Sequence, residues 1–437
     1  MTVRCQRLVT AAAEGTDMVA LILEGACANT NLRHNLDRAT SVGGLTIVER
    51  AVLAARRAGV DRCVVVGTTR PHETVKVRLR ASGAKVSFVD WGALRRLDLS
   101  DGALVIRDCV LVEPRALAAL LGCYSDGRTI LTAGGTETDP DLVVVPPDNV
   151  SILGGVTSEL EFLLQLSNVP SRRQVSLGPL FCQRLGADSD VVRAEIDYIR
   201  HQNGGASESY FTKRIRRFSV PLSRALARRG ATPTQVTLAG LVLAIASATA
   251  VSFGTYVASL FGAVLYYASM VLDCSDGEVA RLSFRDSAFG AWLETIVDYA
   301  SYFLLLGGLV LGSQQRESAE LYQQAAFVAL AGSILIAAVA GYLRHRVAGA
   351  APGEFDDASA AALAKASPFH RFARWGRQWI KRSTIAHLVV MLALVNQLPF
   401  LIYLWAFGAV VGSVMILGVE PFIVRRVKVE ALAQGGK

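Results

Sequence analysis

The chain reads Asp273-Cys-Ser-Asp276-Gly277-Glu-Val-Ala280-Arg281, continues for eight residues, and then reads Gly290-Ala-Trp-Leu-Glu294-Thr-Ile-Val-Asp298. Long apolar segments flank this stretch, so it joins two expected membrane-spanning helices. On a helix, Asp273 and Asp276 share a face because they are three residues apart, and Glu294 and Asp298 share a face at a separation of four. Two antiparallel helices can therefore direct four carboxylates toward one volume.

Four carboxylates in one place repel one another unless cations neutralise them. Hard divalent ions such as Mg²⁺ or Mn²⁺ prefer carboxylate oxygens and share their remaining positions with phosphates. Two such ions suit displacement at phosphorus, because together they hold the attacking and the leaving oxygen. Gly277 and Gly290 let a diphosphate or a neighbouring helix approach the backbone, and Arg281 can pair with a diphosphate oxygen. A purely structural role in helix-end ion pairs is disfavoured, because Glu294 and Asp298 lie inside an otherwise apolar span.

This stretch resembles the signature of the CDP-alcohol phosphotransferase family, written D-x2-D-G-x2-A-R-x8-G-x3-D-x3-D. Seven of its eight defined positions match at the family's spacing. The exception is the third carboxylate, where Glu294 stands in place of aspartate and its longer arm must fold back or shift a bound metal.

The resemblance implies a site for a CDP-linked donor, with CMP as the leaving group. The four carboxylates Asp273, Asp276, Glu294 and Asp298 would hold two divalent ions, Mg²⁺ or Mn²⁺, and Asp298 would be the base that deprotonates an alcohol acceptor. The nucleotide site would include Gly277, Ala280, Arg281 and Gly290, with Thr234 nearby in a segment (231–237) that resembles the family's first-span start. The resemblance also implies a homodimer.

Composition agrees with a membrane domain. Hydrophobic residues make up 52% of the 437 residues and charged residues 19%, and the mean hydropathy is +0.37. Residues 231–437 are expected to form an all-α domain with six transmembrane helices. The expected spans are about 234–253, 256–273, 288–311, 321–343, 383–398 and 400–423.

Basic residues predict the orientation of these spans. With residue 230 in the cytoplasm, one basic residue, Arg316, falls in an outside loop, and the following fall inside: Arg281, Arg285, Arg344, Arg346, Arg371, Arg374, Arg377, Lys381, Arg382, Arg425, Arg426 and Lys428. We therefore expect a multi-pass protein of the cytoplasmic membrane, with both the N-terminal domain and the C-terminus cytoplasmic. This clustering beside membrane spans also accounts for the net charge of +8, so no nucleic-acid partner is expected.

Other basic residues have two interpretations. Arg344 and Arg346 end the fourth expected span and could bind a phosphate on the acceptor, although an anchoring role is favoured. Residues 201–230 are expected to form a polar linker followed by the basic, amphipathic segment 210–229, and Phe369–Arg382 is expected to form a second interfacial helix.

The N-terminal part, residues 1–200, alternates predicted strands and helices. Expected strands cover 18–25, 62–67, 85–89, 103–112, 129–132 and 141–145, and expected helices cover 45–58, 72–82, 114–121 and 191–200. This alternation predicts a three-layer, Rossmann-like α/β domain with a largely parallel sheet.

The order of these elements resembles a nucleotidyltransferase of the sugar-nucleotide type. Val42–Arg50 and Gly59–Asp61 resemble that family's second element, and Val105–Asp108 resembles its metal-binding strand. The loop Glu24–Arg33 has one glycine and no matching lysine, whereas a phosphate-binding loop needs glycines and free backbone N–H groups. The domain is therefore expected to be a degenerate scaffold, dimerisation surface or lid; an active cytidylyltransferase is the alternative.

The whole chain resembles the fused arrangement of an inositol-phosphate cytidylyltransferase with a di-inositol-phosphate phosphate synthase. This makes a polyol phosphate one candidate acceptor, while the donor could be a soluble CDP-alcohol or CDP-diacylglycerol, with a membrane lipid as partner or product. Two other functions remain open: a membrane prenyltransferase, which also uses acidic motifs and Mg²⁺, and an inactive membrane-anchored binding protein or transporter.

Overall fold

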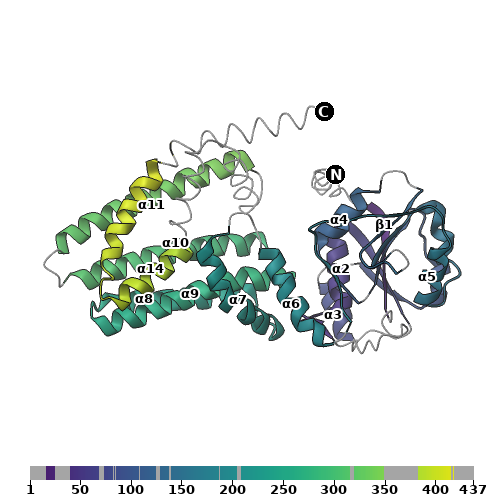
Figure 1. Cartoon of the computed structure of the whole chain (residues 1–437), viewed down its shortest axis with the longest axis horizontal. Coiled ribbons are helices and arrows are strands. Elements are labelled where there is room, and N and C mark those ends of the chain that lie inside the picture. The colour runs from purple at the N-terminus through teal and green to yellow at the C-terminus, as the bar shows by residue number, and fades with distance from the viewer. Residues whose placement is uncertain are drawn as a thin grey trace. The chain divides into compact units, whose positions relative to one another are not determined.

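The structure of the chain is a computed structural model that divides into two compact units, residues 1–201 and 202–437. We call them the α/β unit and the helical unit (Figure 1). The described residues are 16–24, 40–67, 73–81, 83, 85–107, 109–124, 128–136, 139–186, 188–203, 208–314, 319–348, 382–414 and 417.

A seven-stranded sheet forms the centre of the α/β unit, in the order β10-β8-β9-β6-β1-β4-β5. Its strands are β1 (Thr16–Leu23), β4 (Val60–Val66), β5 (Lys85–Val89), β6 (Ala103–Arg107), β8 (Ile130–Ala133), β9 (Leu142–Val145) and β10 (Arg172–Gln174). The central strand β1 runs parallel to both neighbours, and Leu21 pairs with Val64 on one side and Val105 on the other. β9 is antiparallel to β6 and β8. The sheet is therefore largely parallel, as the sequence predicts, with one reversed strand.

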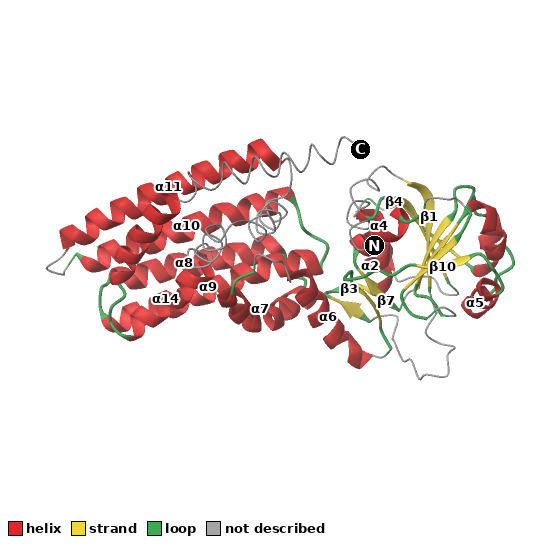
Figure 2. Cartoon of the chain, turned by 45° about the horizontal axis from the view of Figure 1, so that its top comes forward, coloured by secondary structure: helices red, strands yellow, loops and turns green. Residues whose placement is uncertain are grey.

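Helices cover both faces of this sheet (Figure 2). The α-helices are α2 (Ile47–Arg57), α3 (Glu73–Ala81), α4 (Pro114–Gly122) and α5 (Glu159–Ser167), and the 3₁₀ helices are η2 (Trp91–Arg96) and η3 (Pro147–Leu153). A further helix, α6 (Asp188–Asn203), begins in this unit and ends two residues past its boundary at residue 201. Because side chains alternate along a strand, Val19, Leu21 and Leu23 share a core with Phe162 of α5 and Leu153 of η3. α2 packs against β1 and β4. The predicted α/β architecture is confirmed.

One expected strand is divided in the structure. Residues 103–112 form β6, which belongs to the main sheet, and β7 (Val110–Val112), which pairs with β11 (Cys182–Arg184) instead.

A second small pair, β2 (Ser41–Val42) and β3 (Leu45–Thr46), precedes α2. Thr46 and Glu49 start α2 with reciprocal side-chain caps, the capping box.

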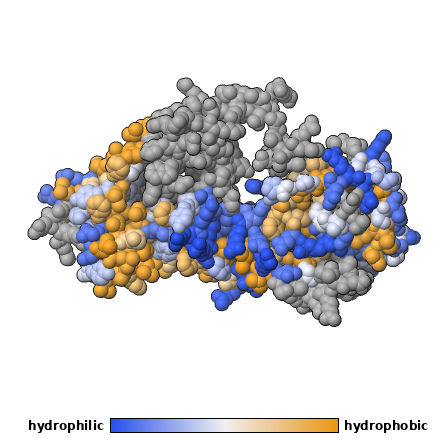
Figure 3. All heavy atoms as spheres, viewed as in Figure 1, coloured by the Kyte–Doolittle hydropathy of each residue, from blue (hydrophilic) through white to orange (hydrophobic). Residues whose placement is uncertain are grey.

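The helical unit is built from helices, most of which have apolar outer faces. They are α7 (Tyr210–Arg228), α8 (Pro233–Ser252), α9 (Tyr256–Leu282), α10 (Ala288–Ser313), α11 (Ala319–Ala348), α14 (Arg382–Leu394) and the helix Phe400–Val414. α9 packs against α7, α8 and α14, while α10 packs against α8 and α11. Large apolar side chains such as Val242, Phe261 and Phe327 are exposed, and Figure 3 shows hydrophobic residues gathered over this unit. Exposed apolar helix faces of this kind suit a lipid surrounding.

Four helices in the described part of the chain are long and apolar enough to cross a membrane, namely α8, α9, α10 and residues 319–339 of α11. The fifth and sixth expected spans coincide with two shorter apolar helices, Arg382–Leu394 and Phe400–Val414. The expected count of six spans therefore stays a prediction.

Glycines allow α8 and α10 to approach closely. A Cβ atom on Gly308 of α10 would lie 2.5 Å from the carbonyl oxygen of Ala248 on α8, whereas a Cβ atom on the adjacent Gly307 would meet nothing within 4 Å. We expect Gly308→Ala to destabilise the helical unit by about 1–3 kcal/mol, because the two backbones must separate. Gly307→Ala is the matched control and should leave the apparent melting temperature in detergent nearly unchanged. Equal melting temperatures for the two variants would contradict this packing.

Candidate active site

Helices α9 and α10 carry the four acidic side chains that the sequence pattern singled out. α9 begins after its cap Thr255 and continues unbroken to Leu282, well beyond residue 273, where the expected span ended. The whole stretch Asp273–Arg281 is therefore helical. α10 begins after Ser287, whose hydroxyl accepts a hydrogen bond from the Gly290 backbone N–H at 3.0 Å.

Asp273 and Asp298 meet at one cation, the guanidinium of Arg382. Arg382 is the first residue of α14, and its Nη1 donates to Asp273 Oδ1 at 2.6 Å and also to Asp298 Oδ1. The side chain of Arg382 is 7% exposed and that of Asp273 is 15% exposed. Charges this deeply buried are stable when they are paired. One guanidinium thus compensates two carboxylates from two helices.

Asp276 faces α8 and is almost fully buried. The hydroxyl of Thr237 on α8 donates to Asp276 Oδ2 at 2.6 Å. Thr234, which the sequence resemblance places near the nucleotide, lies three residues earlier on α8 and is partly exposed. The structure therefore brings Thr237, rather than Thr234, into hydrogen-bond contact with Asp276.

Glu294 lies one helical turn before Asp298 and is partly buried. Asp273 interacts electrostatically with Asp276, Glu294 and Asp298, so the four carboxylates share one region. Arg281 and Arg382 act electrostatically on Glu294. The acidic group, defined as these four carboxylates, thus has two basic neighbours.

The acidic group suits a divalent cation in its chemistry but is not arranged as a complete metal site. Within the described ranges, no three His, Cys, Asp or Glu side chains are placed to hold a metal ion. All four side chains nevertheless supply hard oxygen donors, and the guanidinium of Arg382 shows that Asp273 and Asp298 can share a positive charge. Arg382 bonds the Oδ1 atom of each of these two carboxylates, so a metal ion that used the same oxygens would compete with it. The expected pair of divalent ions stays a prediction.

The remaining signature residues are Gly277 and Ala280 on α9 and Gly290 on α10. A Cβ atom on Gly277 would lie 3.2 Å from Arg281 Nη1, so glycine at this position leaves room for the guanidinium. Ala280 is partly buried on the same helix. Gly290 lies in the first turn of α10 and is held by the cap from Ser287.

Some expected positions lie outside the described residues. Arg344 and Arg346 belong to the last turns of α11, but their side chains are among those not described. The expected interfacial helix at 369–382 is described at Arg382 alone. The proposed acceptor contacts of Arg344 and Arg346 therefore stay predictions.

Residues 25–33 of the loop Glu24–Arg33, which lacks the glycines of a phosphate-binding loop, and Asp108 also lie outside the described residues. Beside Asp108, the buried side chain of Arg107 pairs with Asp139 at 2.5 Å. Arg184 pairs with Asp141 at 2.6 Å and also with Asp139. The two aspartates described near this strand end are thus paired with arginines.

Sequence reasoning missed the contacts of Arg382 and Thr237. In the sequence, Arg382 follows Lys381 among many basic residues expected as cytoplasmic anchors, so nothing distinguishes Arg382 from an anchor. Thr237 lies in the segment 231–237, whose resemblance to the family's first-span start implies no role for it. A polar side chain inside an apolar helix was the available indication for Thr237.

Comparisons with known proteins agree with the motif. Residues 231–414 match the family model described as CDP-alcohol phosphatidyltransferase. A relative from Aquifex aeolicus (strain VF5), named bifunctional IPC transferase and DIPP synthase, is 26% identical over 177 residues, which cover 40% of this chain and 40% of that protein. Archaetidylinositol phosphate synthase from Methanothermobacter thermautotrophicus is 36% identical over 99 residues, covering 22% of this chain and 47% of that protein. The matched part thus spans less than half of either relative.

A solved structure similar to the chain is the inositol-1-phosphate CTP transferase from T. maritima. Its sequence is 13% identical, the match covers 44% of this chain and 98% of that chain, and the TM-score is 0.33. The resemblance that the signature predicts is confirmed by the family match to residues 231–414.

Proposed function

We propose that the helical unit transfers a substituted phosphoryl group from a CDP-linked donor to an alcohol acceptor and releases CMP. The observation that carries this proposal is the acidic group on α9 and α10 beside Arg281, within a segment that matches the CDP-alcohol phosphatidyltransferase family model. Carboxylates on two helices that both pack against α8 can hold a reaction centre rigidly, which phosphoryl transfer requires.

In the proposed reaction, Asp298 accepts the proton of the acceptor hydroxyl. The acceptor oxygen forms a bond to the donor phosphorus that carries the alcohol group. The bond from that phosphorus to the bridging oxygen of CMP breaks, and CMP leaves with the electron pair. Arg281 binds a diphosphate oxygen, and Gly277 keeps the helix surface open beside it. Divalent ions held by Asp273, Asp276, Glu294 and Asp298 would neutralise diphosphate charge when bound.

The proposed acceptor is a polyol phosphate, and inositol phosphate is the first compound to test. The M. thermautotrophicus relative is named archaetidylinositol phosphate synthase, and the layout of this chain resembles a fused di-inositol-phosphate phosphate synthase. Arg344 and Arg346 are the proposed contacts for the acceptor phosphate. The donor is CDP-inositol or CDP-diacylglycerol, and the experiment below separates the two.

We further propose that the α/β unit is a nucleotidyltransferase-like scaffold without catalytic activity. The loop sequence Glu24–Arg33 supports this role, because it lacks the glycines that a phosphate-binding loop needs. The cytoplasmic location of this unit and the expected homodimer belong to the same proposal.

The deciding experiment is a CMP-release assay with the purified full chain and Mg²⁺ or Mn²⁺. CDP-inositol and CDP-diacylglycerol are supplied as donors with a panel of alcohols that includes inositol phosphate. Acceptor-dependent CMP release supports the transferase and identifies the donor. Metal binding without release from any pair would favour an inactive binding protein, and turnover of a prenyl diphosphate would favour the prenyltransferase.

Thr234 and Thr237 of α8 provide a matched test of the site geometry. We expect Thr237→Val to lower kcat/KM about tenfold, because Asp276 loses a charge-assisted hydrogen bond worth about 1.5–3 kcal/mol. Thr234→Val makes the same chemical change three residues away and should have a smaller effect. A larger loss for Thr234→Val would instead support the nucleotide contact that the sequence resemblance implies.

A further inference from the structure

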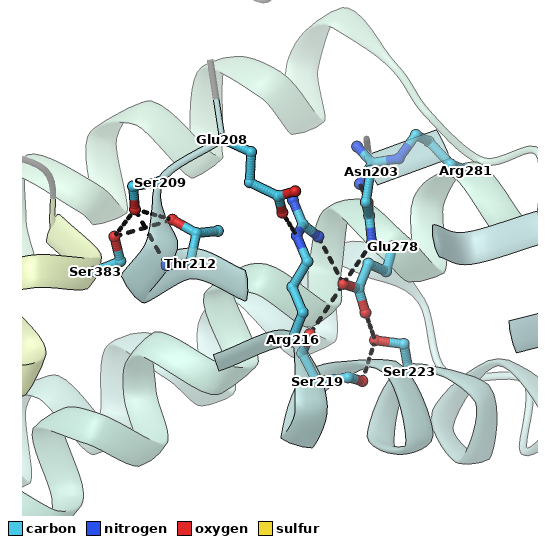
Figure 4. Close-up of polar contacts among 10 residues, drawn as sticks. All are labelled: Asn203, Glu208, Ser209, Thr212, Arg216, Ser219, Ser223, Glu278, Arg281 and Ser383. Carbon is cyan, nitrogen blue, oxygen red and sulfur yellow. Dashed lines mark hydrogen bonds and ion pairs between the residues drawn. The ribbon is translucent and has the colours of Figure 1, made fainter. Parts of the chain in front are cut away.

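Glu278 lies inside the signature stretch but has no role in the proposed reaction. It is 1% exposed. Its carboxylate accepts four hydrogen bonds: from Ser219 Oγ at 2.9 Å, Ser223 Oγ at 2.6 Å, Arg216 Nη1 at 2.7 Å and Asn203 Nδ2 at 2.9 Å (Figure 4). A buried carboxylate is tolerated when its lone pairs are used in this way.

Three of these donors come from α7, the amphipathic helix expected at the headgroup level. The face of α7 toward α9 is built from buried small residues at intervals of four, namely Ser219, Ser223 and Ala227. Small residues let two helices approach closely, and the carboxylate of Glu278 fits between the two serines. These polar contacts hold α7 in one register against α9, the helix that carries Asp273–Arg281.

A second group of hydroxyls fixes the start of α7. Ser383 Oγ on α14 lies 3.1 Å from Ser209 Oγ and 3.0 Å from Thr212 Oγ1 (Figure 4). Ser383 follows Arg382, the residue that pairs with Asp273 and Asp298. α7 is thus fastened to α9 and α14, two of the three helices that carry charged groups of the site.

Asn203 connects Glu278 to Arg281. Its Nδ2 donates to Glu278 Oε1, and its Oδ1 accepts from Arg281 Nη2 at 2.8 Å. One amide therefore satisfies an acidic and a basic side chain at once. The Nε atom of Arg281 is buried without a hydrogen-bond partner among the described residues. The Arg281 guanidinium is thus held through Nη2, and its Nε–H remains a donor without a partner among the described residues.

We propose that Glu278 is a positioning residue, which acts through Asn203 to hold the Arg281 guanidinium in place for the donor diphosphate. The inference rests on the proposed transferase function. Glu278 itself touches no reacting atom, so its loss should weaken binding of the donor more than it slows the chemical step. Asn203 is the relay, because it is hydrogen-bonded to both residues.

The test measures CMP release as a function of donor concentration, and CMP affinity by calorimetry, in the full chain. We expect Glu278→Gln to raise the donor KM and the CMP Kd about tenfold while kcat changes less than about threefold. Asn203→Ala should produce the same shifts. The double variant should raise the donor KM and the CMP Kd no more than the more affected single variant does. Both substitutions break the same connection between Glu278 and Arg281.

Ser247→Ala is the matched control for loss of a buried hydrogen bond. Ser247 is fully buried on α8 and donates to the Gly262 carbonyl oxygen at 2.7 Å, away from the acidic group. The Ser247→Ala variant should leave the donor KM and the CMP Kd unchanged. If Glu278→Gln fails to fold, Asn203→Ala alone decides the question, because it leaves the contacts of Glu278 to α7 intact.

The outcomes separate this inference from the proposed function. A wild-type chain that neither releases nor binds CMP would reject both. An active wild type whose two single variants keep the donor KM, or whose effects on the CMP Kd add in the double variant, would overturn the positioning role while leaving the transferase intact.

Discussion

Asp298→Asn is expected to lower the rate of CMP release by about 100- to 10,000-fold, the range typical for loss of a general base. Asparagine keeps the size of the side chain but cannot accept the proton of the acceptor hydroxyl. The substitution also removes one of the two carboxylates that pair with Arg382. Steady-state CMP release with saturating donor and acceptor measures the effect.

Asp286→Asn is the matched control for this substitution. Asp286 is exposed between α9 and α10, outside the acidic group, so the same chemical change should leave the rate within about twofold of wild type. A normal rate for Asp298→Asn would show that another group takes the proton. Because Glu294 lies one turn away on the same helix, Glu294→Gln would then be the next variant to measure.

Arg382→Gln is expected to have the largest effect on stability in the absence of metal. Removing one partner of a buried ion pair costs about 3–5 kcal/mol, and here Asp273 and Asp298 would lose the cation that they share. Mn²⁺ should then stabilise the variant more than the wild type, because no guanidinium competes for the two carboxylates. We expect about tenfold tighter Mn²⁺ binding, equivalent to about 1.4 kcal/mol, measured by titration and by thermal shift in detergent.

Arg285→Gln serves as the control, since Arg285 is an exposed arginine of the same unit. It should change neither the melting temperature nor the Mn²⁺ affinity. Unchanged Mn²⁺ affinity in Arg382→Gln would mean that the guanidinium and the metal ion do not compete for the same carboxylates, and that Arg382 has a separate role.

Much of the architecture could be predicted from local pattern. Alternating apolar strands and helical segments predicted the α/β unit, because periodicity in a sequence follows the geometry of the element. The division of 103–112 into β6 and β7 could not be seen, because both halves are apolar and buried. The reversal of β9 was missed for a related reason: a buried strand has the same composition in either direction.

The sequence by itself determined that four carboxylates at helical spacing lie on two neighbouring apolar helices, since spacing along a helix decides which side chains share a face. Only the tertiary structure decided which partners those carboxylates have. Arg382 reaches Asp273 across 109 residues, and Thr237 reaches Asp276 across 39. Glu278 receives three of its four hydrogen bonds from α7, more than 50 residues earlier in the chain. Periodicity specifies the buried face of a helix, but the packing of distant helices selects the side chain that neutralises each buried charge.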